Sequence, residues 1–182
     1  MTSKAMTALS ILAAGFISLA TTVQADEVNI ITTQVSEQIY MIEGKGGNIG
    51  LFIGKDGTFL IDDQFAPLTE KIIEAIKSVG GDYPKFLINT HYHGDHTGGN
   101  ENLGRGGTLI FSHDNVRERL STGSFIEAFN MQRSGVTPEG LPVVTFSEDI
   151  SCHLNGDSVQ AIHVPHAHTD GDSFIHFKAA NV

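Results

Sequence analysis

The stretch NTHYHGDHTGGNENLG, residues 89–104, decides how this 182-residue chain is interpreted. Within six positions it places four side chains that commonly bind metals: His91, His93, Asp95 and His96. Imidazole together with carboxylate suits zinc better than calcium or magnesium. An exposed polar loop with chance histidines is the alternative, but so many ligand-type residues in six positions disfavour it. The stretch therefore predicts a zinc site whose remaining ligands lie elsewhere in the chain.

The expected backbone geometry divides these four residues into two pairs. The apolar run KFLIN at 85–89 predicts a central strand, which the chain leaves just before the histidines. In extended backbone, residues two apart point to the same side, so His91 and His93 can reach one ion. Asp95 and His96 then face back from the start of the next element. Since adjacent residues cannot easily share one small ion, we expect a second metal beside the first.

Composition limits the classes of partner. The formal net charge is −10, and the 11 lysines and arginines are scattered rather than gathered in a stripe. This excludes a typical nucleic-acid binder and disfavours anionic lipid, so we expect a small-molecule substrate. Cys152 is the single cysteine, so no intramolecular disulfide is possible. It alternates with polar residues in DISCHLNG, which predicts a buried thiol on the core face of a strand.

The first 25 residues have the pattern of a secretory signal peptide. One charge, Lys4, precedes an apolar run from about residue 8 to residue 20, and Val23-Gln24-Ala25 supplies small residues for cleavage. An uncleaved anchor is the alternative, but a spanning helix needs about 20 apolar residues. We expect cleavage after Ala25, a mature domain at 26–182, no stable membrane anchor, and a periplasmic or secreted protein.

The body of the chain predicts strands with interspersed helices in one layered α/β or α+β domain. Residues 55–57 (KDG) join two strands in a hairpin, and residues 67–79 have the apolar spacing of a helix that Gly80-Gly81 stops. Residues 107–121 read as a strand followed by a helix that opens at Asp114. Residues 141–182 read as a run of strands with turns at 147–148, 155–156 and 169–172.

Three motifs resemble the metallo-β-lactamase superfamily. HYHGDH, residues 91–96, matches its H-x-H-x-D-H signature. GTFLIDDQF, residues 57–65, resembles its early strand that ends in a structural aspartate, and VPHAHTDGDSFIHF, residues 164–177, resembles its second histidine motif. The resemblance covers essentially the whole chain after residue 25. It implies an αββα sandwich of two similar halves, both of which contribute metal ligands.

The resemblance also assigns roles to individual residues. It implies that His91, His93 and His168 bind a first zinc ion. Asp95 and His96 would bind a second, and Asp95 would also orient a bridging hydroxide or take part in proton transfer.

Neighbouring residues receive other roles. Asp62, rather than Asp63, would accept hydrogen bonds that fix the ligand loop, because it stands at the strand end. His166 competes with His168, but the dipeptide His168-Thr169 matches the motif. Four further histidines are read as non-ligands: His113, His153, His163 and His176.

The chain departs from the family pattern at its end. Members continue with a bridging aspartate and a last histidine for the second metal, whereas this sequence stops at FKAANV, residues 177–182. We therefore expect an N-terminal fragment or a truncated product that lacks the later strands and helices. Its second metal site would be incomplete, and the 182 residues alone would be weakly active or inactive. The sequence leaves the oligomeric state open.

Three functional hypotheses follow. The first is a zinc-dependent hydrolase in which metal-bound hydroxide attacks an ester, thioester or amide carbonyl, including that of a β-lactam. The second is an iron-dependent oxidoreductase of the same fold acting on persulfides, since such relatives keep the six-residue signature. The third is an inactive remnant that only binds metal. Metal analysis separates the first two hypotheses.

Overall fold

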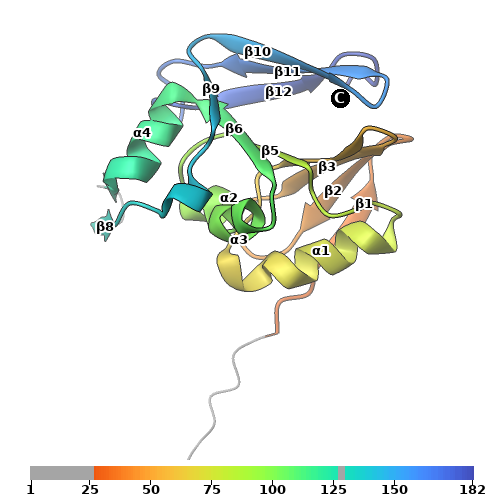
Figure 1. The fold of residues 1–182 in the computed structure, drawn as a ribbon, viewed down its shortest axis with the longest axis horizontal. Coiled ribbons are helices and arrows are strands. Elements are labelled where there is room, and N and C mark those ends of the chain that lie inside the picture. The colour runs from red at the N-terminus through yellow and green to blue at the C-terminus, as the bar shows by residue number, and fades with distance from the viewer. Residues whose placement is uncertain (1–26, 127–129) are drawn as a thin grey trace, which may run out of the picture.

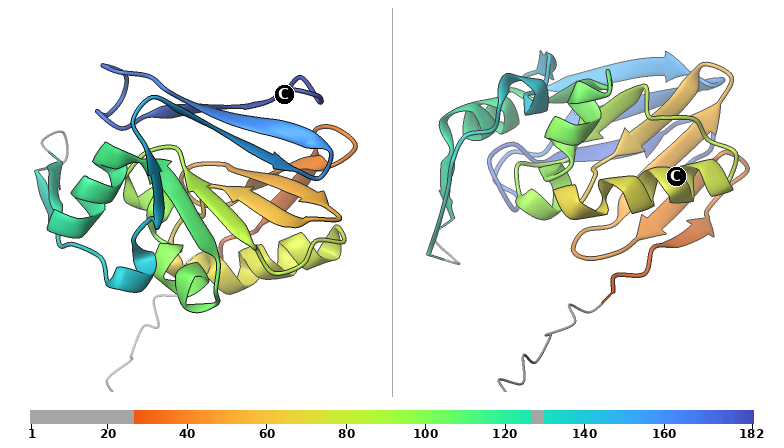
Figure 2. Two further views of the ribbon diagram at one scale, coloured as in Figure 1. Left: turned by 45° about the horizontal axis from the view of Figure 1, so that its top comes forward. Right: turned by 60° about the horizontal axis from the view of Figure 1, so that its bottom comes forward.

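The computed structural model describes residues 27–126 and 130–182. They form three layers (Figure 1): helices cover one face of a large sheet, and a smaller sheet lies over its other face. The helical layer consists of α1 (Thr69–Ser78), α2 (Gly94–Thr97) and α3 (Asn100–Arg105). The two turned views in Figure 2 show the same order of layers. The predicted signal peptide at 1–25 lies outside the described residues.

Seven strands form the large sheet in the order β1-β2-β3-β4-β5-β6-β9. They are β1 Ile31–Gln34, β2 Ile39–Glu43, β3 Ile49–Gly54, β4 Gly57–Ile61, β5 Phe86–Asn89, β6 Leu109–His113 and β9 Val144–Phe146. The first four pair antiparallel, whereas β4, β5, β6 and β9 run parallel. The carboxyl ends of the parallel strands meet at one edge, where ligand sites of α/β sheets are usually found.

The second sheet has three antiparallel strands in the order β10-β11-β12. They are β10 Asp149–Leu154, β11 Asp157–His163 and β12 Ser173–Phe177. Helix α4 (Asp114–Thr122) follows β6, and its residues Val116 and Leu120 are buried. A small hairpin of β7 (Ser124–Ile126) and β8 (Met131–Arg133) forms a separate two-stranded sheet. The described residues also form two 3-10 turns, η1 Ala66–Leu68 and η3 Pro138–Gly140.

The central strands of the large sheet are buried on both faces, which explains their continuous apolar runs. In β4, Phe59 and Ile61 belong to the core between the two sheets, whereas Leu60 belongs to the core under the helices. Between the sheets, the Phe52 ring of β3 meets the Phe177 ring of β12 edge-on, with centroids 5.2 Å apart. The two sheets are therefore held by direct aromatic packing as well as by burial.

Helix α1 covers the other face. Ile72, Ile73 and Ile76 recur at helical spacing and are all buried against the large sheet. Gly80, with φ of +87°, ends the helix in the left-handed conformation that glycine adopts without strain. The predicted helix at 67–79 and its glycine stop are confirmed.

The predicted fold class is confirmed as a layered α/β domain. The hairpin at 55–57, the strand–helix pair at 107–121 and the late strands are all present. Of the expected αββα order, the described residues supply one helical layer and both sheets. The β7–β8 hairpin was not predicted. Cys152 faces the inter-sheet core as expected but is only half-buried, and burial raises the pKa of its thiol.

Within the described part of the chain, no helix combines the length and the apolar character that crossing a bilayer requires.

Asn155 joins the two sheets at the end remote from the parallel strand ends. Its side chain accepts a hydrogen bond from the backbone of Asp56 (2.8 Å) and donates one to the carbonyl of Gly57 (2.9 Å). Its backbone N–H donates in turn to the Asp56 carboxylate (2.6 Å). The turn of the β3–β4 hairpin is thus tied to the turn of the β10–β11 hairpin.

We expect Asn155→Ala to lower the free energy of unfolding by about 2 kcal/mol, because it removes two part-buried hydrogen bonds of the Asn155 side chain and strains a φ of 53°. Asn181→Ala is the matched control, since Asn181 has a similar φ of 56° but is exposed. Urea unfolding of both variants measures the difference. Equal losses in the two variants would show that the backbone strain matters and the link between turns does not.

Candidate metal centre

His91 and His93 lie just after the end of a strand of the large sheet, as the sequence predicts. Strand β5 ends at Asn89, and His91 and His93 follow in the segment before α2. His93 has extended dihedrals (φ −68°, ψ 151°) and precedes the first helical residue, Gly94. The backbone N–H of His96 donates to the His93 carbonyl (3.0 Å), so the helical turn begins at once. This bend carries the second pair, Asp95 and His96, back beside the first.

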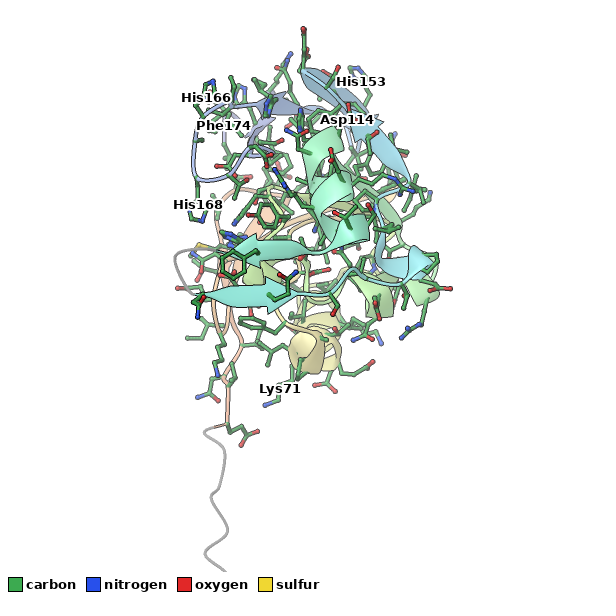
Figure 3. The ribbon with its side chains drawn as sticks, turned by 90° about the vertical axis from the view of Figure 1, so that its left-hand side faces the viewer. Lys71, Asp114, His153, His166, His168 and Phe174 are labelled. Carbon is green, nitrogen blue, oxygen red and sulfur yellow. The ribbon has the colours of Figure 1, made fainter. Side chains whose placement is uncertain are left out.

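The late histidine joins the early pair across 75 positions of sequence. His168, in the connection between β11 and β12, brings its Nε2 to 3.0 Å from Nδ1 of His93. The ligand atoms of His91, His93 and His168 all lie within 4.8 Å of one another. Figure 3 shows His168 on the side of this connection that is nearer the large sheet. The predicted convergence of three imidazoles is present in the structure.

The donor set fits a zinc ion. Two nitrogens bound to one tetrahedral zinc at 2.0–2.1 Å stand about 3.3 Å apart, close to the separation of the His93 and His168 nitrogens. Burial, with the neighbouring histidines, lowers the pKa of His91 to about 4, so its ring is neutral at neutral pH. A neutral imidazole offers the lone pair that a metal requires.

Asp62 holds the segment that carries the early ligands, between Thr90 and His96. Its carboxylate accepts hydrogen bonds from the backbone N–H and hydroxyl of Thr90 (2.8 and 2.7 Å) and lies 2.7 Å from Nδ1 of His96. Asp63 instead accepts from the backbone of Gly99 (2.9 Å), and burial raises its pKa well above the usual value. The choice of Asp62 over Asp63 as the residue that orients the ligand loop is confirmed by these contacts.

Asp95 and His96 form a second pair next to the trio. The His96 ring centroid lies 4.1 Å from that of His91, and its Nε2 lies 3.4 Å from the Asp95 carboxylate. Burial would lower the pKa of His96, but the hydrogen bond and charge of Asp62 outweigh it and raise that pKa. Since Nδ1 faces Asp62, Nε2 is the nitrogen that faces Asp95. Among the described residues, this pair is not part of a three-ligand group.

Sequence reasoning missed the loop that packs on this second pair. A Cβ added to Gly46 would stand 2.6 Å from Cβ of Asp95, and one added to Gly47 would stand 2.5 Å from Nε2 of His96. Gln64 holds the loop, since its amide donates to the Gly47 carbonyl (2.5 Å) and accepts from the backbone of Lys45 (3.2 Å). The GKGG sequence was the available signal, because closely packed backbone often requires glycine.

We expect Gly47→Ala to weaken metal binding by Asp95 and His96 about tenfold, because the new methyl group displaces the His96 ring. The affinity of the three-histidine site should change far less. Competition with a chelating dye separates the two affinities. Gly107→Ala is the control: its φ of +94° is strained by alanine, but an added Cβ meets nothing within 4 Å. If both variants weaken binding equally, general destabilisation explains the result.

Asp172 is the second residue that sequence reasoning missed. Its carboxylate accepts from the backbone of His168 (2.6 Å) and from the backbone and hydroxyl of Thr169 (3.1 and 2.5 Å). Burial alone would raise the pKa of Asp172, but these hydrogen bonds lower it. The spacing Thr169-x-x-Asp172 within the predicted turn at 169–172 was the signal for this side-chain turn.

The remaining histidines stay outside the trio. In Figure 3, His166 lies on the connection between β11 and β12, farther from the large sheet than His168, and His153 lies on β10. The His113 and His163 rings stack on each other with centroids 3.7 Å apart. Within the described residues, none of these four belongs to a group that could hold a metal. His113 is buried, and both of its ring nitrogens bond to backbone groups.

Comparison with known proteins agrees with this geometry. The sequence model of the metallo-beta-lactamase superfamily matches residues 42–182. The chain is similar in structure to the subclass B3 metallo-beta-lactamase BJP-1 of Bradyrhizobium japonicum, with a TM-score of 0.68 and 20% identity over 80% of this chain and 56% of that one. It is similar to native FEZ-1 from Legionella gormanii, with a TM-score of 0.69 and 17% identity over 80% and 57%.

A third similar structure is the class B3 di-zinc enzyme LRA-12 from an Alaskan soil metagenome, with a TM-score of 0.69 and 16% identity over 80% and 56%. At these identities the likeness establishes the fold alone. The chain spans little more than half the length of each of these structures.

Proposed function

The chain belongs to the metallo-β-lactamase superfamily, and from this premise we propose that it is a secreted zinc-dependent hydrolase. Its substrate would be a small molecule with an ester, thioester or amide carbonyl, a β-lactam among them. The observation that carries the proposal is the trio of His91, His93 and His168, whose ligand atoms lie within 4.8 Å of one another. Three imidazoles with an open fourth position are a common ligand set of catalytic zinc.

Each residue of the site would have its own role in hydrolysis. His91, His93 and His168 would hold the first zinc, and Asp95 with His96 would contribute to a second. The chemistry that bound zinc supplies is a nucleophilic hydroxide near neutral pH and polarisation of a carbonyl. The Asp95 carboxylate would orient the nucleophile and accept a proton. Asp62 would keep His96 in the tautomer that leaves Nε2 for the metal.

Three observations support the proposed kind of substrate, the export and the choice of metal. A formal net charge of −10 favours a small-molecule substrate over a nucleic acid. The signal-peptide pattern that ends at Ala25 favours export to the periplasm or medium. The relative LRA-12 is described as a di-zinc enzyme, which favours zinc here. Fold likeness does not fix the substrate, so the carbonyl class rests on the chemistry of the site.

Metal analysis combined with a substrate panel tests the proposal. The chain is expressed with and without residues 1–25, its bound metals are measured, and hydrolysis of β-lactams, thioesters and lactones is assayed before and after chelation. We expect bound zinc, and at most weak hydrolysis by the 182 residues alone, which chelation removes and added zinc restores. Bound iron with persulfide oxidation would replace this proposal with the oxidoreductase. A chain that binds no metal would overturn both.

A further inference from the structure

We propose that His163 and His113, which are not ligands themselves, are positioning residues that hold His168 at the metal centre. The inference rests on the proposed function, because it concerns the affinity of the same three-histidine site. It assigns a role to two stacked rings, a buried one (His113) and a half-buried one (His163), that the proposed chemistry leaves unused.

His168 depends on Asp172 for its place. It lies in the connection between β11 and β12, where its backbone N–H donates to the Asp172 carboxylate (2.6 Å). The backbone carbonyl of Asp172 in turn accepts from Nδ1–H of the His163 ring (3.0 Å) and from the N–H of Val164 (2.9 Å). The residue that fixes His168 is therefore itself fixed by the imidazole of His163.

The His163 ring packs against a second ring that is itself held by hydrogen bonds. It stacks on the His113 ring with centroids 3.7 Å apart and planes 12° from parallel. His113 is 5% exposed, and both of its ring nitrogens are engaged. Nδ1 accepts from the backbone N–H of Asn115 (3.2 Å), and Nε2–H donates to the carbonyl of Ser147 (3.1 Å). These bonds fix the ring plane against which His163 lies.

Helix α4 holds the same connection at a second point. The Asn115 side chain donates to the Asp170 carbonyl (2.6 Å), and Arg119 pairs with the Asp170 carboxylate (2.7 Å). Gly171 packs so closely that an added Cβ would stand 2.8 Å from Val116. These contacts hold the β11–β12 connection against α4, but they involve residues 170 and 171 and not Asp172. The contacts that bear on Asp172, and through it on His168, come from the His163 ring and the N–H of Val164, and the ring is the one supplied by a side chain.

The expected effect follows from how tightly a ligand must be placed. Groups that orient a metal ligand typically account for 10- to 100-fold in metal affinity when they are removed. His163 acts on His168 through one intermediate residue, so we expect about the lower end of that range. His163→Ala should thus weaken zinc binding at the three-histidine site about tenfold.

Zinc affinity of the full chain, measured by competition with a chelating dye, tests the proposal. His163→Asn keeps a donor near the place of Nδ1 and should recover part of the loss. His163→Phe keeps the stacked ring but loses the donor, so it should bind as weakly as His163→Ala. His153→Ala, an exposed histidine on the neighbouring strand β10, should bind zinc normally. Melting temperatures are recorded for every variant.

A double-mutant cycle separates positioning from general stability. In a chain that already carries His168→Ala, adding His163→Ala should change the affinity less than about twofold, because its effect passes through His168. A full tenfold loss in that background, or normal affinity in the single variant, would overturn the inference and leave the proposed function intact. A wild-type chain that binds no zinc would overturn the proposed function and this inference with it.

Discussion

His91→Ala is expected to abolish tight zinc binding at the three-histidine site. Two imidazoles remain after the change, fewer than the three protein ligands that catalytic zinc normally has. The loss of affinity should exceed about 100-fold, the upper end of what removal of a merely orienting group produces. Zinc content after gel filtration and affinity by dye competition measure it, and hydrolysis should fall with occupancy.

Two comparisons keep this test specific. His153→Ala removes an exposed histidine from β10 and should retain its zinc. His93→Ala should match His91→Ala, although the His93 side chain is less buried, because both supply ligand atoms to the same trio. Similar metal loss in the His153 and His91 variants would contradict the ligand assignment.

Asp62→Ala is expected to destabilise the fold and the second metal pair together. Asp62 is 3% exposed, and its carboxylate faces two donors of Thr90 and one nitrogen of His96. Its removal takes away the acceptor of the Thr90 N–H and of the His96 ring, and leaves the Thr90 hydroxyl with Nδ1 of His91 (3.1 Å), which should lower the free energy of unfolding by about 3 kcal/mol. The freed His96 ring should also bind a second zinc about tenfold more weakly. Urea unfolding and zinc titration measure the two effects.

Asp62→Asn supplies the graded comparison, since it keeps the shape and one acceptor oxygen and should lose about half as much stability. Asp82→Ala, at an exposed aspartate, is the neutral control. Normal stability with Asp62→Ala would mean that the hydrogen bonds at Thr90 and His96 do not support the ligand loop.

Local rules were enough to predict the early half of the site. The alternation of His91 and His93 and the bend at Gly94 depend on residues within a few positions of one another. Both follow from extended backbone and glycine geometry. The same holds for helix α1, whose apolar spacing and glycine stop are local features.

The late half of the site depends on contacts that no local pattern reveals. His168 was assigned through the resemblance alone, because its place depends on packing between α4 and the β11–β12 connection. The stack of His113 on His163 joins residues 50 positions apart, so the same histidines read as isolated in sequence. Gln64 was missed for the same reason, since it holds a loop 17 positions earlier. Pairings of this kind are fixed by topology rather than by spacing.

Anomalous scattering at the zinc edge from crystals of the zinc-loaded chain tests the central claim most directly. The account predicts a peak within about 2.0–2.1 Å of one nitrogen from each of His91, His93 and His168. A peak elsewhere, or a His168 ring that lies more than about 10 Å from the early pair and so beyond the reach of any zinc–nitrogen bond, would contradict it.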